Sequence, residues 1–107
     1  LHHWSRRTSS FWNDFDLLLT PVLGGLTPTI GLLSDPKTGQ QQLRELIGFV
    51  DQANVTGQPA ISVPVGEHEG LPIGVQVIAA RGQDTLLLQI AQQLEDSEAF
   101  TKLSNEL

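Results

Sequence analysis

The sequence has no cysteine, no methionine and few cations, and each of these shortages excludes a class of structure or function. Without cysteine the chain can form neither a disulfide nor a thiolate metal site, which favours a cytoplasmic protein. Six scattered lysine and arginine residues stand against twelve acidic ones, giving a net charge of −6. A nucleic-acid surface needs clustered positive charge, so nucleic acid is not an expected partner. A chain that begins at Leu1 and lacks methionine is also expected to be a piece of a longer protein.

Long apolar runs and metal-binding spacings are missing as well. Apolar runs such as residues 17–19 and 86–88 are far shorter than the roughly 20 residues that span a bilayer, so no membrane segment is expected. The histidines at positions 2, 3 and 68 are too far apart in sequence for a local zinc site, and neither a metal nor a cofactor is expected. The length and apolar content suit one compact unit.

What is present predicts alternating helices and strands. Residues 16–22, DLLLTPV, form a continuous apolar run that ends at Pro21, and such a run is typical of a strand covered on both faces. This chain alone is too small to supply both covers. The aromatic spacing between residues 4 and 15 predicts an amphipathic helix with a buried stripe of Trp4, Phe11, Trp12 and Phe15.

The middle of the chain is predicted to be an irregular connection followed by one helix. Residues 23–42 are rich in glycine, proline and threonine and show little periodicity, so a long loop is expected. Residues 40–54 regain helical spacing, and Asn54 and Gly57 are expected to end the helix.

The last third of the chain predicts a hairpin and a final helix. Residues 60–65 and 71–80 are rich in β-branched side chains and are joined by the polar segment 66–70, which predicts two antiparallel strands. Asp84 or Thr85 is expected to cap a helix with an apolar stripe of Leu87, Ile90, Ala91 and Leu94, and Arg81-Gly82 is expected to form the break before it.

Ser34 and Lys37 form the sharpest local motif, S-x-x-K, in which a lysine one helical turn away can activate a serine nucleophile. That mechanism needs both residues on one helix, and Pro36 opposes a helix there. A turn is the preferred interpretation, and a small serine–lysine hydrolase is the least favoured alternative. Gly24 and Gly25 lack the lysine and the following helix of a phosphate loop and are interpreted as a flexible turn.

The other polar candidates do not form a catalytic constellation. Asp14 with Asp16, and Glu67 with Glu69, are spaced two apart and would point to opposite sides of an extended chain. Neither pair is set to share a substrate. His68 lies at the expected hairpin tip, where contact with water is the simplest interpretation.

Three stretches, taken in order, carry a resemblance to a known family: DLLLTPV at 16–22, FVDQANVTGQPAISVPVG at 49–66 and GLPIGVQVIAARGQDTLLLQIAQQLE at 70–95. They closely resemble the C-terminal end of amidase-signature enzymes. The matching points include Thr20-Pro21, Asn54-x-Thr56-Gly57-x-Pro59-Ala60 and Gly70-Leu71-Pro72-x-Gly74-x-Gln76.

The resemblance implies an α/β fold, the C-terminal part of the amidase-signature fold, with a mixed β-sheet flanked by helices. Residues 1–107 would then be a C-terminal segment rather than an independent complete domain, and the partner of this segment would be the remainder of the amidase polypeptide. Family members hydrolyse carboxamides with a serine that a second serine and a lysine activate, in a Gly/Ser-rich region upstream. This sequence has no GGSSGG-like run, and its only lysines are Lys37 and Lys102. No catalytic residue is therefore assigned to it.

The resemblance also implies that the helix before Asn54 presents one face to the acyl side of the substrate pocket. That face selects Arg44, Ile47 and Asp51 as candidate substrate-pocket residues. Ile47 would contact apolar atoms of a small-molecule amide, while Arg44 or Asp51 would bias the charge of the pocket. An ordinary half-exposed helix is the simpler alternative for each residue.

A second hypothesis is a noncatalytic interaction module that kept the amidase scaffold. Uncovered apolar strands would drive it to self-associate, so it predicts a homo-oligomer. The enzyme hypothesis instead predicts that the isolated chain is inactive.

Overall fold

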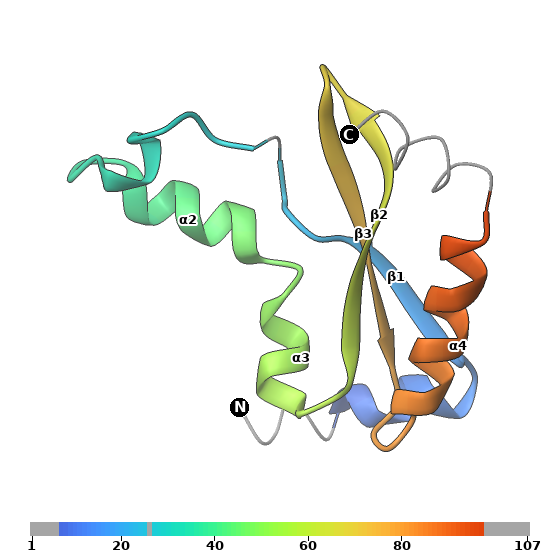
Figure 1. The fold of residues 1–107 in the computed structure, drawn as a ribbon. Coiled ribbons are helices and arrows are strands. Elements are labelled where there is room, and N and C mark those ends of the chain that lie inside the picture. Colours follow the sequence, from blue (N-terminus) through green and yellow to red (C-terminus); the bar gives the residue numbers. More distant parts are fainter. Residues whose placement is uncertain (1–6, 26, 98–107) are drawn as a thin grey trace.

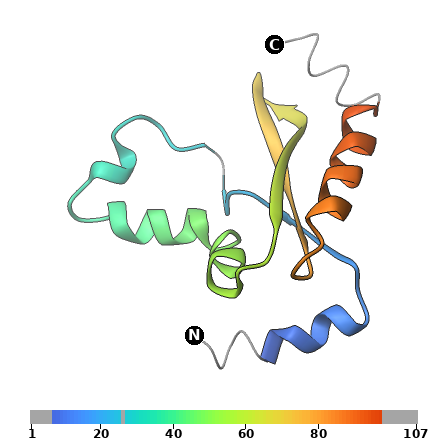
Figure 2. The ribbon, with the colours of Figure 1, turned by 60° about the horizontal axis from the view of Figure 1, so that its bottom comes forward.

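Residues 7–25 and 27–97 are described by the computed structural model and form a three-stranded sheet with helices on both sides (Figure 1). The strands are β1 (Leu17–Pro21), β2 (Ala60–His68) and β3 (Leu71–Ala79), in the spatial order β1-β3-β2. Helix α4 (Asp84–Glu95) lies on one side of the sheet, and α2 (Gly39–Ile47) and α3 (Asp51–Thr56) lie on the other (Figure 2). The expected α/β class is confirmed, and these three strands contribute an antiparallel portion of sheet.

Strand β1 confirms the strand predicted over residues 16–22. Its first residue, Leu17, pairs with Ala79 at the end of β3 in antiparallel register. Leu18 is half-buried, whereas Leu19 keeps 60% of its surface exposed. The described part of this chain therefore covers the strand only partly, as the unbroken apolar run indicated.

Strands β2 and β3 form the predicted hairpin, but with a shorter turn than the sequence indicated. A loop is predicted over 66–70, whereas the strands run on until only Glu69 and Gly70 lie between them. Both have positive φ, 53° and 79°, as in the two-residue turns whose twist matches that of paired strands. A register shift between Pro64 and Gly66 absorbs the proline and lets pairing resume beyond it.

Helix α4 covers the face of the sheet that holds the main apolar core. Leu87 packs there with Val77 and Ala79 of the central strand, and Leu17 and Ile61 pack against this cluster from the two edge strands. Successive residues of a strand point to opposite faces. The even-numbered residues of β3 therefore point toward the side on which α2 and α3 lie.

The prediction that Asp84 or Thr85 caps α4 is wrong, because the helix begins one or two residues earlier than that prediction requires. The N-cap is Gln83, and its side chain makes no capping hydrogen bond. Gly82, with φ of 82°, provides the predicted break before the helix. Asp84 instead lies in the first turn, where its negative charge favours the positive end of the helix dipole.

The single helix predicted over 40–54 is wrong, because the chain forms two helices with a break between them. Helix α2 ends at Ile47, α3 begins at Asp51, and the N–H of Val50 donates to the Ile47 carbonyl at 3.0 Å across the break. Gly48, a poor helix former, lies in the interruption. Of the two residues expected to end the helix, Gly57 does follow α3, with φ of 71°, whereas Asn54 lies inside α3.

The aromatic residues near the N-terminus form a small cluster rather than a buried stripe. Phe11 and Trp12 lie in a 3-10 helix, η1 (Ser10–Asn13), and the Phe11 ring stacks on Phe15 at a centroid distance of 4.6 Å. Phe11 and Trp12 are half-buried and Phe15 is 55% exposed. The prediction that these side chains form a buried stripe is therefore wrong for this chain. Trp4 lies outside the described residues. A second 3-10 helix, η2 (Leu32–Ser34), interrupts the predicted loop.

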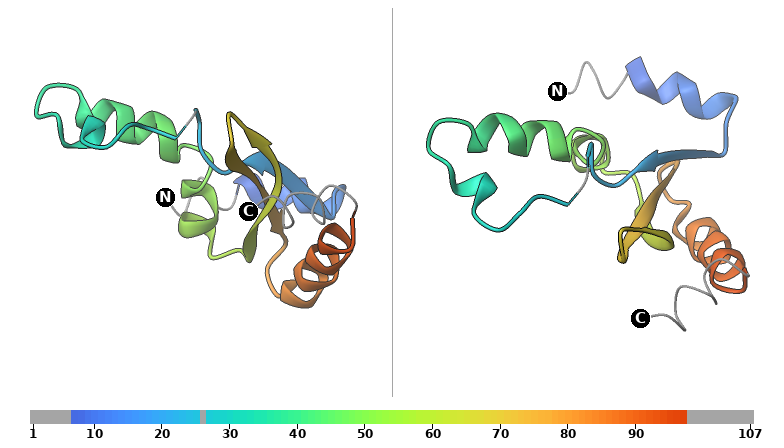
Figure 3. Two further views of the ribbon diagram at one scale, coloured as in Figure 1. Left: turned by 45° about the horizontal axis from the view of Figure 1, so that its top comes forward. Right: turned by 90° about the horizontal axis from the view of Figure 1, so that it is seen from above.

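The molecule is flat, its surface is large for its mass, and α2 extends away from the sheet (Figure 3). It measures 40 × 40 × 16 Å, and its radius of gyration of 15.9 Å exceeds the value of about 13 Å for a compact domain of this length. Its accessible surface of 7837 Å² is about a third larger than a monomer of 11.7 kDa normally exposes. Within the described ranges, no helix is long and apolar enough to cross a membrane.

Candidate functional site

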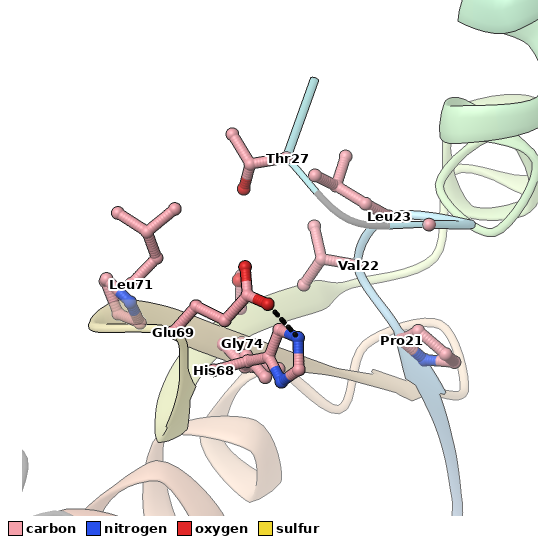
Figure 4. Close-up of a pocket in the computed structure, with 12 residues that line it drawn as sticks. Pro21, Val22, Leu23, Thr27, His68, Glu69, Leu71 and Gly74 are labelled. Atoms are coloured by element: carbon pink, nitrogen blue, oxygen red, sulfur yellow. Dashed lines mark ion pairs between the residues drawn. The ribbon is translucent and has the colours of Figure 1, made fainter. Parts of the chain in front are cut away.

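A hollow of about 350 Å³ opens between the segment after β1 and the tip of the β2–β3 hairpin (Figure 4). We call it the hairpin hollow. Two apolar walls and a few polar side chains line it: Pro21, Val22 and Leu23 on the first wall, Leu71, Pro72 and Ile73 on the second, and Thr27, Ser62, His68 and Glu69 among the polar groups.

Two glycines permit the close packing around the hairpin hollow. A Cβ at Gly74 would lie 3.2 Å from Ser62 Oγ and 3.3 Å from Val22 Cγ2, so this position leaves little room for a side chain. A Cβ at Gly24 would lie only 2.1 Å from the Glu45 carbonyl oxygen. The backbone bends at Gly24, as the interpretation of a turn had it, but the residue is packed against the end of α2 and fixes the first wall there.

The hairpin tip places an ion pair at the rim of the hollow. His68 Nε2 lies 3.7 Å from Glu69 Oε1, and the two side chains are 50% and 80% exposed. The expectation that His68 faces water is confirmed. An exposed pair of this kind contributes little to stability.

The hairpin hollow is better suited to binding than to covalent chemistry. Its hydroxyl groups belong to Thr27 and Ser62, and no lysine lines it beside them. Leu71 and Ile73 keep 55% and 45% of their surfaces exposed, so the second wall is open to further contacts. Apolar walls with a few polar groups are typical of ligand pockets.

Gln76 lies two residues from Gly74 on the same face of β3 and links three parts of the chain. It is 6% exposed, and its Nε2 donates to the Phe49 carbonyl at 2.7 Å and to Thr20 Oγ1 at 2.9 Å. The central strand is thereby joined to the end of β1 and to the break between α2 and α3.

A second buried group of polar side chains holds the end of α3. Thr56 Oγ1 lies 2.7 Å from Gln58 Oε1, and Gln58 Nε2 donates to the Ala79 carbonyl at 3.1 Å. The Arg81 guanidinium donates to the Thr56 carbonyl through Nε at 2.8 Å and also through Nη2. The C-terminal end of this short helix is therefore fixed to the end of β3 by side-chain hydrogen bonds.

The three candidate substrate-pocket residues lie on either side of the helix break. Arg44 is exposed on α2, Ile47 is half-buried at its last position, and Asp51 is exposed at the first position of α3. None of them lines the hairpin hollow. Their contact with a substrate stays a prediction.

The Ser34–Lys37 motif is a turn, as the preferred interpretation had it. Ser34 ends the 3-10 helix η2, and the backbone N–H of Lys37 donates to Asp35 Oδ1 at 2.8 Å. The two residues therefore do not share a helix. Asp14, Asp16, Glu67 and Glu69 are all exposed.

Sequence reasoning treated the residues of the two polar groups as scaffold and missed their hydrogen bonds. A signal was present, because Gln76 is one polar residue within the apolar central strand VQVIAA. Buried polar side chains are nearly always hydrogen-bonded, so a glutamine at such a position predicts a specific partner. In the described part of the chain, no group of three or more acidic, histidine or cysteine residues is placed to hold a metal ion.

Comparison with known proteins gives consistent matches over most of the chain. The family model described as Amidase matches residues 2–88. The 6-aminohexanoate-cyclic-dimer hydrolase of Paenarthrobacter ureafaciens is 39% identical over 89% of this chain, and the fatty acid amide hydrolase of Arabidopsis thaliana is 38% identical over 87%.

A solved structure gives the same match in three dimensions. The structure of 6-aminohexanoate cyclic dimer hydrolase complexed with substrate superposes with a TM-score of 0.76 and 37% identity over 88% of this chain. The chain spans about a fifth of the length of the curated relatives it matches, 22% in the Paenarthrobacter protein and 16% in the Arabidopsis protein. It aligns with their C-terminal part.

Proposed function

Because this chain belongs to the amidase family, matched over residues 2–88, we propose that it is the C-terminal portion of an enzyme that hydrolyses carboxamides. The products would be a carboxylic acid and ammonia or an amine. The observation that carries the proposal is the alignment of nearly the whole chain with only about a fifth of its amidase relatives. Residues 1–107 would then be one segment of a larger amidase domain.

The flat shape of the molecule supports this view. Leu19 on the edge strand β1 is 60% exposed, and Leu88 on α4 is 66% exposed. Apolar side chains on an unpaired edge strand favour further association. In the proposed enzyme the remainder of the polypeptide covers them, and burial would stabilise the fold by about 25 cal/mol for each Å² of apolar surface.

The catalytic groups come from the remainder of the polypeptide in this proposal. The family resemblance implies a serine that attacks the amide carbonyl, forms an acyl-enzyme as the C–N bond breaks, and is released by water. The S-x-x-K motif of this chain is a turn, which removes Ser34 and Lys37 as an alternative nucleophile and base. The chain itself supplies strands and part of the substrate pocket.

Ile47, Arg44 and Asp51 form the proposed pocket wall. Ile47 would contact the apolar acyl portion of the amide, and the charges of Arg44 and Asp51 would bias its polar end. The relatives' names support an amide as substrate class, since one is a fatty acid amide hydrolase. We also propose that the enzyme is cytoplasmic, as the lack of cysteine in this sequence led us to expect.

A noncatalytic, self-associating module is the alternative that the exposed surface also favours. A second copy of the chain would then cover the exposed apolar side chains. Light scattering on the isolated chain, together with the activity assay, separates the two proposals. A stable, monodisperse dimer of the isolated chain, with no carboxamide hydrolysis by any longer polypeptide that contains it, supports the module.

The experiment that tests the proposal compares the full-length polypeptide containing this segment with the isolated chain of 107 residues. Both are assayed for carboxamide hydrolysis by release of ammonia or amine. The proposal predicts activity in the full-length polypeptide and none in the isolated chain. A full-length polypeptide that hydrolyses no carboxamide contradicts it.

A further inference from the structure

A side chain of the central strand donates a hydrogen bond to the break between α2 and α3. Phe49 lies outside both helices, and its carbonyl accepts a hydrogen bond from Gln76 Nε2 at 2.7 Å, a contact between residues 27 positions apart. A backbone carbonyl in an interrupted helix needs such a partner, because the regular helical one is lost. The side chain of β3 thus stabilises the interruption directly.

The orientation of the Gln76 amide is fixed by its second partner. Nε2 also donates to Thr20 Oγ1 at 2.9 Å, and the Thr20 hydroxyl in turn donates to the Pro21 carbonyl at 2.9 Å. An amide with both N–H groups committed cannot rotate without losing a buried hydrogen bond. At 6% exposure, water cannot readily replace either partner.

The position of α3 depends on these contacts because the helix is too short to be stable alone. It has six residues, and isolated helices shorter than roughly 12 residues are marginal in water. Thr56 and Gln58 fix its C-terminal end to Ala79 of the central strand. Gln76 fixes the chain just before its N-terminal end, which leaves the helix one defined position on the sheet.

We propose that Gln76 is a positioning residue for the substrate-pocket wall. Through the Phe49 carbonyl it sets the break, and with it the relative placement of Ile47 and Asp51, which lie on either side. Gln76 itself does not contact the substrate. This inference rests on the proposed function, in which Ile47 and Asp51 contact the acyl portion of a carboxamide.

The test uses the full-length amidase with Gln76→Leu, which removes both donors while keeping a similar side-chain size. Thr20→Val is the second variant: it removes one partner of Gln76 but leaves the bond to Phe49. Gln92→Leu is the matched control, because Gln92 is exposed on α4 and its side chain donates to Asp96, the residue that follows that helix. Each enzyme is assayed on carboxamides of increasing acyl-chain length.

The proposal predicts that Gln76→Leu changes the ratio of kcat/KM between long and short acyl chains by about tenfold, mainly through KM. Thr20→Val should change that ratio by less than Gln76→Leu, because it keeps the bond to Phe49, and Gln92→Leu should leave it within about twofold of the wild type. A merely structural role would lower the active fraction and reduce kcat equally for all substrates. Equal reduction, or no change, in Gln76→Leu overturns the proposal.

Amide hydrogen exchange in the same proteins tests the role of Gln76 without any activity assay, so it separates this inference from the proposed function. Gln76→Leu should speed exchange of the amides at residues 48–51, whereas Gln92→Leu should not. If the wild type hydrolyses no carboxamide, the proposed function fails, while the exchange result still decides whether Gln76 holds the break. Unchanged exchange at 48–51 contradicts the positioning role.

Discussion

The backbone N–H of Gly24 donates a hydrogen bond to the Leu46 carbonyl at 2.9 Å, joining the segment after β1 to the last turn of α2. These residues are 22 positions apart in sequence. The contact needs a residue without a side chain, since a Cβ at Gly24 would lie 2.1 Å from the Glu45 carbonyl oxygen. One wall of the hairpin hollow is thereby fixed to the helix that carries Arg44 and Ile47.

Gly24→Ala is expected to lower the free energy of unfolding of the full-length protein by about 1–3 kcal/mol, because the added methyl group must displace backbone. Gly25→Ala is the matched control: its Cβ would meet only the Leu46 side chain, at 4.0 Å. Urea denaturation measures both. Equal stability of the two variants would show that the close approach at Gly24 is unimportant.

Thr56→Val is expected to destabilise the fold by about 1–3 kcal/mol, because it leaves buried polar atoms without a partner. The Thr56 hydroxyl lies 2.7 Å from Gln58 Oε1 and 3.0 Å from the Gln52 carbonyl, and it also accepts the Gln58 N–H at 3.4 Å. Thr85→Val, at an exposed position on α4, is the control and should change little. Thermal unfolding of both variants provides the comparison, and a loss of the same size at Thr85 would argue against the buried network.

Ser34→Ala and Lys37→Ala are expected to leave kcat/KM of the full-length enzyme within about twofold of the wild type, because neither side chain is placed for catalysis. Steady-state assays of carboxamide hydrolysis measure this. Asp35→Ala, which removes the acceptor for the Lys37 N–H, should affect the stability of the turn and not the chemistry. A loss of several orders of magnitude in Lys37→Ala would restore the serine–lysine hypothesis.

Ile47→Ala is expected to lower kcat/KM for long-chain carboxamides by about tenfold, with a smaller effect on short ones, because removed methyl groups no longer contact the acyl chain. Leu43→Ala on the same helix is the control, since Leu43 is 43% exposed and is not among the proposed pocket residues. Competition between a long and a short carboxamide measures the ratio directly. An unchanged ratio in Ile47→Ala would remove this residue from the pocket wall.

Much of the fold was predictable because local chemistry decided it. The apolar run of β1, the turn glycine after α3 and the Gly82 break before α4 all lie where the sequence places them. The hairpin was predicted too, but its turn was not, because the register shift at Pro64 lets the strands pair beyond the proline. The register shift depends on how the two strands pair, so the sequence of either strand alone does not predict it.

The errors have a common origin in contacts between distant residues. Periodicity over 40–54 favours one helix, yet Gln76 binds the Phe49 carbonyl and Gly48 weakens the helix at that point. Gly24 was interpreted from its neighbours in sequence, whereas the close approach of α2 is what requires a residue without a side chain there. The aromatic residues near the N-terminus follow helical spacing, but spacing alone does not supply the surface that would bury Phe15.

Ammonia or amine release by the full-length polypeptide and by the isolated chain of 107 residues, at equal concentration and on the same carboxamides, tests the central claim most directly. The account predicts hydrolysis by the full-length polypeptide and only background release by the isolated chain, because in the proposed enzyme the remainder of the polypeptide supplies the nucleophile and its activating lysine. Hydrolysis by the isolated chain at a comparable rate would contradict the account and place the catalytic groups among these residues.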